Sequence, residues 1–235
     1  MKRLFFIIIA LICTMSIDAQ VVKIYRGDQL IIKHKVQDGD KVVFEADTPT
    51  TGKATRTDNI EVNWVQLWED GPKFAEYNVG ADNNKPEDYG GYYTWGGKHK
   101  NGSDIQWTDD HNAGADALKG EYDTATQLWG DNWRMPTKEE LEALLDNCDK
   151  QWTTVEGVNG YKFTGRDEYS SNSIFLPAAG SCHSGGNIAH PSEQGKYWSS
   201  TPEGNDAKSM EYNSIMPFMT YGYRYNGYSV RAVLK

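Results

Sequence analysis

The sequence predicts an α+β domain with two short helices, short antiparallel strands and long irregular loops, preceded by a small N-terminal β segment. Only two segments carry the apolar spacing of a helix, whereas several short runs alternate between apolar and polar residues. The stretches between them are rich in glycine and aromatic residues, which favours turns and loops over further helices. Few helices combined with many short strands are typical of an α+β domain.

The first helix is expected in "YDTATQLWG", residues 122–130. Asp123 is a good N-cap, because its carboxylate can accept a hydrogen bond from an unpaired backbone N–H of the first turn. Ala125, Leu128 and Trp129 form a one-sided apolar stripe, and Gly130 provides a C-terminal stop. This pattern predicts a short helix with one buried side.

The second helix is expected in "NWRMPTKEELEALLDNC", residues 132–148. Thr137 and Glu140 match the S/T-x-x-E capping box, in which each side chain accepts a hydrogen bond from the other residue's backbone N–H. The apolar residues that follow at helical spacing are Leu141, Leu144, Leu145 and Cys148. We therefore expect an amphipathic helix of three turns.

Short strands are expected in "SIFLPAAG", "KYWSST", "AKSMEYNS" and "GYSVRAVLK". The last run alternates most clearly, because successive side chains of a strand point to opposite faces. One face would carry Tyr228, Val230, Ala232 and Leu234. The other face would carry Ser229, Arg231 and Lys235. This alternation predicts a long final strand with one buried face and one polar face.

The N-terminus has the features of a secretory signal peptide, residues 1–19. Its apolar run, residues 4–12, is shorter than the roughly 20 residues that span a bilayer. Ala19 is a small residue at the expected cleavage position, so the mature chain would begin at Gln20. The alternative, lipidation at Cys13, requires a small preceding residue, and Ile12 is not small. No later segment predicts a transmembrane span, and we expect an exported protein that is secreted, periplasmic or on the cell surface.

Residues 20–59 are expected to form the small β segment and a polar linker. Two strands are predicted in "VVKIYRG" and "KVVFEA", with a third between them that ends in an Asp-Gly turn. "DTPTTGKATRTDN", residues 47–59, is rich in Thr, Gly and Pro and is expected as the linker. The main domain would then span residues 60–235. Arg26-Gly27-Asp28 lies at an expected hairpin turn, which favours a turn over an adhesion motif.

Charge and cysteine content limit the partners and the covalent chemistry. Loss of the signal peptide removes two bases and one acid, so the net charge of −9 becomes −10. Such an acidic chain is not expected to bind nucleic acid, because phosphate contacts require Lys and Arg. Cys148 and Cys182 would form a disulfide or remain two buried thiols. The disulfide would close a loop of about 34 residues and stabilise the fold by roughly 3–4 kcal/mol.

No catalytic or cofactor-binding pattern is present. None of the five histidines has a metal-binding spacing such as H-E-x-x-H. "TDDHN" places Asp109 and Asp110 beside His111, which suits a solvated polar loop better than a calcium or zinc site. Ser199 and Ser200 do not lie in a G-x-S-x-G elbow. The sequence therefore predicts no catalytic residue, no metal and no cofactor.

The second helix also carries a resemblance. "NWRMPTKEELEALL" resembles the W-R-x-P-T-x-x-E-x-x-x-L signature of the Fibrobacter succinogenes major paralogous domain family. "FAEYNVGADNNKPEDYGGYYTWGG" is similar to the family's A-x-x-N-V-G-A … P-E-x-Y-G-x-Y-x-x-W-G opening. The later blocks match in order: "DTATQLWGDNWRMPT", "GVNGYKFTG", "SIFLPAAG", "GKYWSST" and "GYSVRAV". The resemblance covers residues 65–233.

The resemblance implies a C-type-lectin-like fold, distantly related to formylglycine-generating sulfatase-modifying domains. In those domains the chemistry depends on a cysteine pair near the C-terminus, and no cysteine follows Cys182 here. Copper-dependent oxidation of a substrate cysteine is therefore not expected. The Glu-Pro-Asn, Gln-Pro-Asp and Trp-Asn-Asp motifs of calcium-dependent sugar binding are also absent. The fold is implied without either chemistry.

Within this framework the residues at the helix start are expected to be structural. Trp133, Arg134 and Pro136 would fix the start of the helix that Thr137 and Glu140 cap. The Arg134 guanidinium would pair with a buried acid or stack on a tryptophan ring.

The resemblance places ligand contacts in the long loops before the final strand, residues 183–195 and 210–226. The second loop, "MEYNSIMPFMTYGYRYN", is dense in Tyr, Met and Asn, and tyrosine suits recognition surfaces. The expected contact residues are Tyr212, Asn213, Tyr221, Tyr223, Arg224 and Tyr225. The alternative is that these aromatic residues fill the core, with alternate residues facing each way.

These observations predict an exported, non-catalytic binding module whose ligand is a glycan or a surface protein. One variant of this hypothesis is a variable protein, whose Asn and Tyr codons are diversified by a retroelement. An alternative is a structural subunit of a cell-surface assembly, with the N-terminal strands pairing with a partner. A divergent enzyme of the formylglycine-generating type is the third and least favoured reading.

Overall fold

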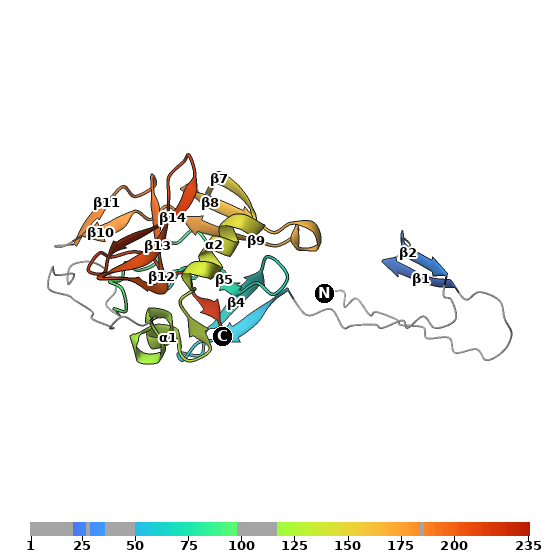
Figure 1. The fold of residues 1–235 in the computed structure, drawn as a ribbon, viewed down its shortest axis with the longest axis horizontal. Coiled ribbons are helices and arrows are strands. Elements are labelled where there is room, and N and C mark those ends of the chain that lie inside the picture. The colour runs from blue at the N-terminus through green and yellow to red at the C-terminus, as the bar shows by residue number, and fades with distance from the viewer. Residues whose placement is uncertain (1–20, 27–28, 36–49, 98–116, 184–185) are drawn as a thin grey trace. The chain divides into compact units, whose positions relative to one another are not determined.

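The computed structural model describes all residues except 1–20, 27–28, 36–49, 98–116 and 184–185 (Figure 1). The chain divides into two compact units, residues 1–47 and 48–235. The expected signal peptide and the expected strand "KVVFEA" lie outside the described residues. The expected α+β class is confirmed, because the described part of the chain consists mostly of β-sheet with two α-helices.

The first unit contains an antiparallel pair of strands, β1 (Val21–Arg26) and β2 (Gln29–Lys35). β2 is the strand that the sequence placed between its two other N-terminal runs. Arg26 pairs with Gln29 at the end of the hairpin. Gly27 and Asp28, which complete the tripeptide at this turn, lie outside the described residues.

The expected linker contributes a strand to the second unit. β3 (Thr51–Thr55) pairs antiparallel along its length with β4 (Glu61–Gln66). Residues 48–59 therefore belong to the main domain, and the boundary lies at 47/48 rather than at 59/60. The sequence did not predict β3. It is an edge strand whose residues are mostly small or polar and alternate between exposed and half-buried.

The second unit contains four described sheets (Figure 1). The largest has the order β3-β4-β5-β15-β6, in which β5 is Lys73–Ala75, β6 is Trp133–Arg134 and β15 is Val233–Leu234. A second sheet joins β7 (Asp149–Val155), β8 (Val158–Thr164) and β9 (Ser173–Pro177). A third joins β12 (Gly195–Glu203), β13 (Asp206–Tyr212) and β14 (Pro217–Tyr223). β10 (Ser181–His183) pairs with β11 (Asn187–Ala189).

Both expected helices are present. α1 (Thr124–Trp129) begins at Asp123, whose carboxylate accepts a hydrogen bond from Thr126 N, and it ends at Gly130. α2 (Lys138–Asn147) has both halves of the expected capping box and lies against the β12-β13-β14 sheet. Two single 3-10 turns, η2 (Gly120–Tyr122) and η3 (Asp167–Tyr169), lie before α1 and between β8 and β9.

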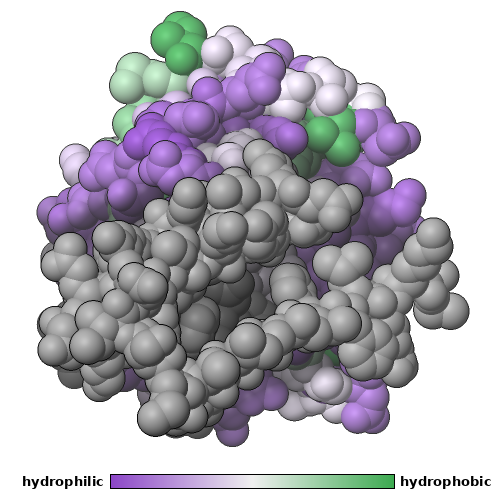
Figure 2. All heavy atoms as spheres, turned by 90° about the vertical axis from the view of Figure 1, so that its right-hand side faces the viewer, coloured by the Kyte–Doolittle hydropathy of each residue, from purple (hydrophilic) through white to green (hydrophobic). Residues whose placement is uncertain are grey.

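The core contains two large clusters of buried side chains. One is rich in tryptophan and contains Trp95, Trp129, Trp133 and Trp198. The other joins the apolar side of α2, with Leu141 and Leu144, to residues of β8, β9 and β13. Large aromatic side chains thus provide much of the buried apolar area, which is the main favourable term in folding. On the face drawn in Figure 2, the described surface is mainly hydrophilic.

The final strand differs from its prediction. Only Val233 and Leu234 form a strand, and two of the three residues of the expected polar face are buried: Ser229 is 0% exposed and Arg231 is 1% exposed, whereas Lys235 is exposed. The Arg231 guanidinium donates hydrogen bonds to Asn78 Oδ1 at 2.9 Å and to the carbonyl oxygens of Glu76 and Phe175, each at 2.8 Å. These acceptors make burial of the charge tolerable.

The expected disulfide is not present in the structure. Cys148 lies in the cluster beneath α2, and Cys182 lies in a separate small cluster with Tyr92 and Ala179. Both side chains are buried. The structure therefore agrees with the alternative reading, in which the even cysteine count reflects two small apolar side chains in the core. Burial raises the pKa of the Cys148 thiol to about 12.

Candidate functional site

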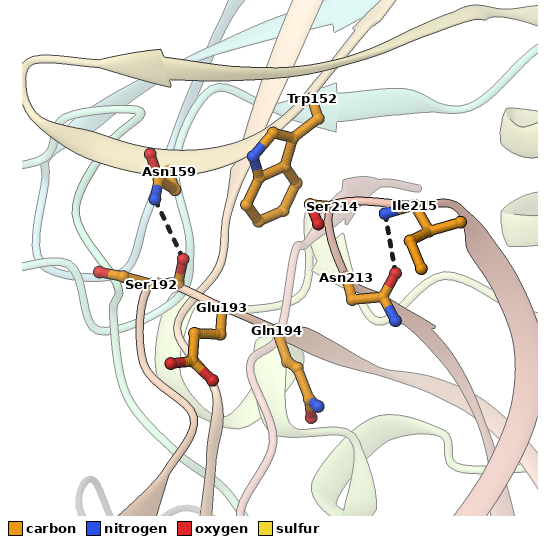
Figure 3. Close-up of a pocket in the computed structure, with 8 residues that line it drawn as sticks. All are labelled: Trp152, Asn159, Ser192, Glu193, Gln194, Asn213, Ser214 and Ile215. Carbon is orange, nitrogen blue, oxygen red and sulfur yellow. Dashed lines mark hydrogen bonds between the residues drawn. The ribbon is translucent and has the colours of Figure 1, made fainter.

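A pocket of about 440 Å³ lies where a hairpin, a loop and a turn from different parts of the chain meet (Figure 3). It is bounded by the β7–β8 hairpin, the loop after β11 and the turn between β13 and β14. Its lining residues are Trp152, Asn159, Ser192, Glu193, Gln194, Asn213, Ser214 and Ile215. The pocket thus combines one aromatic and one aliphatic side chain with six polar ones.

The Trp152 indole forms the aromatic wall of the pocket, and two tyrosine rings pack against it. Its ring is nearly perpendicular to those of Tyr161 and Tyr212, with centroid separations of 5.6 Å and 6.3 Å. Tyr212 is only 2% exposed, and its hydroxyl donates to Leu176 O at 2.6 Å. Burial raises the pKa of Tyr212 well above its ordinary value, so the hydroxyl keeps its proton. Edge-to-face packing of this kind fixes the indole orientation.

The loop wall, residues 190–194, is anchored at several points. Ser192 N donates to Ala178 O at 2.7 Å, and Gly180 N donates to Gln194 O at the same distance. His190 and Ser192 both have positive φ angles, of 54° and 66°. Left-handed backbone at residues other than glycine persists only where surrounding contacts stabilise it, and it is frequent at binding sites.

The β13–β14 turn is the third wall. Asn213 Oδ1 accepts hydrogen bonds from the backbone N–H of Ile215 at 2.9 Å and of Met216 at 3.4 Å. This side-chain turn leaves the other end of the amide, Nδ2, available to a ligand. Ile215 and Met216 are 81% and 55% exposed.

The structure separates the six expected ligand residues. Asn213 lines the pocket, whereas Tyr212 and Arg224 are buried, which contradicts the prediction that they contact ligand. The Arg224 guanidinium lies 4.3 Å from the centroid of the Trp95 ring, and it donates to the backbone carbonyl of Gly204 at 2.9 Å. Arg224 therefore packs the base of the β13–β14 hairpin.

The other three residues form a surface that we call the tyrosine patch: Tyr221, Tyr223 and Tyr225. Tyr221 and Tyr223 are each 57% exposed and, two positions apart on β14, lie on the same face of the sheet. Tyr225 is half-buried and stacks on Tyr223, with a centroid separation of 5.2 Å and an interplanar angle of 13°. Lys208 Nζ lies 5.8 Å from the centroid of the Tyr221 ring.

The tyrosine patch and the pocket lie at opposite ends of one hairpin. Tyr212 pairs with Pro217 near the pocket, and Asp206 pairs with Tyr223 at the patch. From Pro217, Tyr221 is four residues and Tyr223 six residues along β14, which corresponds to about 14 Å and about 20 Å. The expected ligand set is therefore divided between two surfaces that one small ligand would not span.

The residues expected to fix the start of α2 do so. Arg134 Nη1 and Nη2 donate to the two carboxylate oxygens of Glu140 at 2.7 Å and 2.6 Å, and Glu140 Oε2 also accepts from Thr137 N at 2.8 Å. Trp133 is fully buried, and the Pro136 carbonyl accepts from Ser200 N. The expected partners of Arg134 were a buried acid or a tryptophan ring; the structure has an acid, but it is the partly buried capping residue Glu140, 22% exposed.

Neither a metal centre nor a membrane span is found in the part of the chain that the structure describes. No three His, Cys, Asp or Glu residues are grouped closely enough there to hold a metal ion, and no described helix is long and apolar enough to cross a bilayer. Asp109, Asp110 and His111 lie outside the described residues.

Ser192, Glu193 and Gln194 lie in a loop that was expected from the sequence to contact ligand, whereas Trp152 and Asn159 were not expected to do so. The local pattern around Trp152 is polar, so an aromatic residue there with no apolar neighbours was the available signal. The pocket itself depends on three segments that are far apart in the chain. No known protein family, curated protein or solved structure matches this chain.

Proposed function

We propose that this chain is an exported, non-catalytic binding module that recognises a glycan or a surface protein through the tyrosine patch. The observation that carries this proposal is the exposure of Tyr221 and Tyr223, each 57%, on one face of β14, with Tyr225 stacked on Tyr223. Tyrosine offers a large apolar area with a polar tip and few rotatable bonds, so it binds at a low entropic cost.

The proposed domain type is C-type-lectin-like, a member of the major paralogous domain family. This proposal rests on the ordered sequence blocks across residues 65–233. It is supported by a domain with two short helices and many short strands, and by the structural role of the W-R-x-P-T-x-x-E residues at the start of α2. Export rests on the signal-peptide features of residues 1–19.

A binding screen tests the function. The mature chain, residues 20–235, is applied to a glycan array and to a panel of host and bacterial surface proteins, with calcium and with chelator. The proposal expects a ligand whose binding survives chelator. Binding that is lost in chelator would point instead to a metal site, first at Asp109, Asp110 and His111. No binding at all would contradict the proposal.

Diversification of the patch is a separate, genetic part of the proposal. Asn and Tyr codons are rich in adenine, and these residues are frequent in the segment 210–226. A near-copy of the 3′ end of the gene beside a reverse-transcriptase gene is then required. Its absence from the surrounding DNA would end this part of the proposal and leave the binding function untouched.

A subunit of a cell-surface assembly is the second candidate, and the position of β14 favours it. β14 lies at the edge of the β12-β13-β14 sheet, and within the described residues no other strand pairs with its outer side. Such an edge can accept a strand from a partner. Size-exclusion chromatography of residues 20–235 and 48–235 separates the candidates, because self-assembly predicts concentration-dependent oligomers that the shorter chain loses.

A further inference from the structure

We infer that the pocket beside Trp152 is a second binding site, distinct from the tyrosine patch, and that it takes a neutral sugar ring. The proposed function assigns recognition to the patch, about 14–20 Å away along the same hairpin. A volume of about 440 Å³ lies within the range of roughly 300–1,000 Å³ that is typical of small-molecule sites.

The lining has the chemistry that a pyranose ring requires. A sugar ring presents an apolar face of C–H groups and a rim of hydroxyls. The Trp152 indole supplies an aromatic surface for the C–H face (Figure 3). Around it stand side-chain amides, which offer a donor and an acceptor in one plane and so match hydroxyls that are donors and acceptors at once.

Several of the polar atoms are available for a ligand. The side-chain amide of Gln194, the Ser214 hydroxyl and Asn213 Nδ2 make no hydrogen bond to the described residues. Asn159, by contrast, is committed, since its Nδ2 donates to Ser192 O at 3.2 Å and its Oδ1 accepts from Thr154 Oγ1 at 2.7 Å. It fixes the wall, and the other three face the ligand.

The charge of the lining selects a neutral ligand. No Lys or Arg is among the lining residues, and the single ionisable one is Glu193, whose carboxylate lies 3.3 Å from His190 Nδ1. An acidic sugar or a phosphate would meet a carboxylate without a compensating cation. A wholly apolar ligand would leave the Gln194 side chain, the Ser214 hydroxyl and Asn213 Nδ2 without partners.

The walls are also preorganised, which reduces the entropic cost of binding. Trp152 is fixed by Tyr161 and Tyr212, and the turn at Asn213 by its own side-chain hydrogen bonds. Ser192 is held through its backbone and through its hydroxyl, which lies 2.8 Å from Tyr89 Oη.

The test uses saturation-transfer NMR and titration of residues 20–235 with the methyl glycosides of glucose, galactose and mannose, and with N-acetylglucosamine. Glucuronic acid is the anionic comparison. We expect at least one neutral sugar to bind, glucuronic acid to bind more weakly, and Trp152→Ala and Gln194→Ala to reduce affinity by about tenfold or more. Trp152→Phe keeps a ring against Tyr161 and Tyr212 and should retain part of the affinity if Trp152→Ala folds poorly.

Tyr122→Ala is the matched control, because Tyr122 is 56% exposed on η2 and does not line the pocket. The affinity of Tyr122→Ala for the neutral sugar should equal that of wild type. The inference is overturned if no neutral sugar binds, or if folded Trp152→Ala binds as wild type does. A ligand that depends on Tyr221 and Tyr223 alone, with no sugar bound, would overturn this inference and leave the proposed function standing. If a neutral sugar binds the pocket but no ligand is found for the tyrosine patch, the inference is supported and the proposed function is contradicted.

Discussion

The ring of Tyr212 stands edge-on behind the indole of Trp152, with centroids 6.3 Å apart and planes at 72°. Tyr212 was expected to contact ligand, but its side chain is 2% exposed and belongs to the core. It acts on the pocket through Trp152, as a positioning residue. Tyr212, the last residue of β13, points into the core and supports Trp152. The next residue in the chain, Asn213, lines the pocket.

Replacing Tyr212 with Phe should destabilise the domain by about 1–2 kcal/mol. The hydroxyl donates to Leu176 O at 2.6 Å and also lies 2.9 Å from Pro177 O, so its loss leaves buried carbonyl oxygen with fewer donors. Urea unfolding measures the change. Tyr122→Phe, at an exposed tyrosine, should change the free energy of unfolding by less than about 0.5 kcal/mol. Equal stabilities for the two variants would contradict this account.

Glu140→Ala should destabilise the domain by about 1–2 kcal/mol, because it removes the two hydrogen bonds from Arg134 and the cap on Thr137 N. Glu142→Ala is the matched control on the same helix. It removes only a partly exposed pair with Lys138 at 3.3 Å and should cost no more than about 0.5 kcal/mol. Thermal unfolding of the two variants distinguishes a capping residue from a surface acid; a larger loss for Glu142→Ala would refute the assignment.

Cys148 and Cys182 should both react as thiols once the chain is unfolded. Burial and a pKa of about 12 for Cys148 leave little thiolate at pH 8, so iodoacetamide should label Cys148 slowly in the folded protein. In denaturant without reductant, mass spectrometry should find two labels on each mature chain. A chain that takes no label until a reductant is added contains the disulfide and contradicts the structure.

The free energy of unfolding of the wild-type domain should rise relative to that of Asp123→Asn as the pH falls. Burial raises the pKa of its carboxyl above the ordinary value, although the backbone N–H groups of Thr126 and Met135 act in the opposite direction. The folded state therefore binds the proton more tightly than the unfolded chain, and stability from this group is lost as the pH rises through the folded pKa.

Urea unfolding of wild type and Asp123→Asn at pH 7 and near pH 4.5 checks this sign. Asn retains an acceptor oxygen for Met135 N and does not titrate. The difference in free energy of unfolding between wild type and variant should move in favour of wild type at the lower pH. A movement in the other direction would mean that the hydrogen bonds to the carboxylate outweigh its desolvation.

The helices were predictable because their signals are local. Asp123, Thr137 and Glu140 lie within one turn of the residues that they cap, and the apolar residues of α2 recur at helical spacing. The last strand was predicted wrongly because the contacts that bury it come from distant parts of the chain. Arg231 looks like a surface residue in an alternating run, yet acceptors from residues 75–78 and from Phe175 surround it, and no local pattern reveals them.

The candidate surfaces divide in the same way. The density of tyrosine in residues 210–226 located the tyrosine patch, and the period of β14 explains why Tyr221 and Tyr223 are exposed together. The same density wrongly included Tyr212 and Arg224. The pocket required Trp152, the loop at Ser192 and the turn at Asn213 to converge, and chain positions alone do not predict that convergence.

The central claim is that the exposed tyrosines bind a ligand rather than support the fold. The most direct measurement compares wild type, Tyr221→Ala/Tyr223→Ala and the control Tyr122→Ala for binding to the ligand found in the screen, together with their melting temperatures. We predict that the double variant loses binding while its melting temperature stays close to that of wild type, and that the control binds normally. Unchanged binding by the double variant, or a collapse of its folding, would contradict the claim.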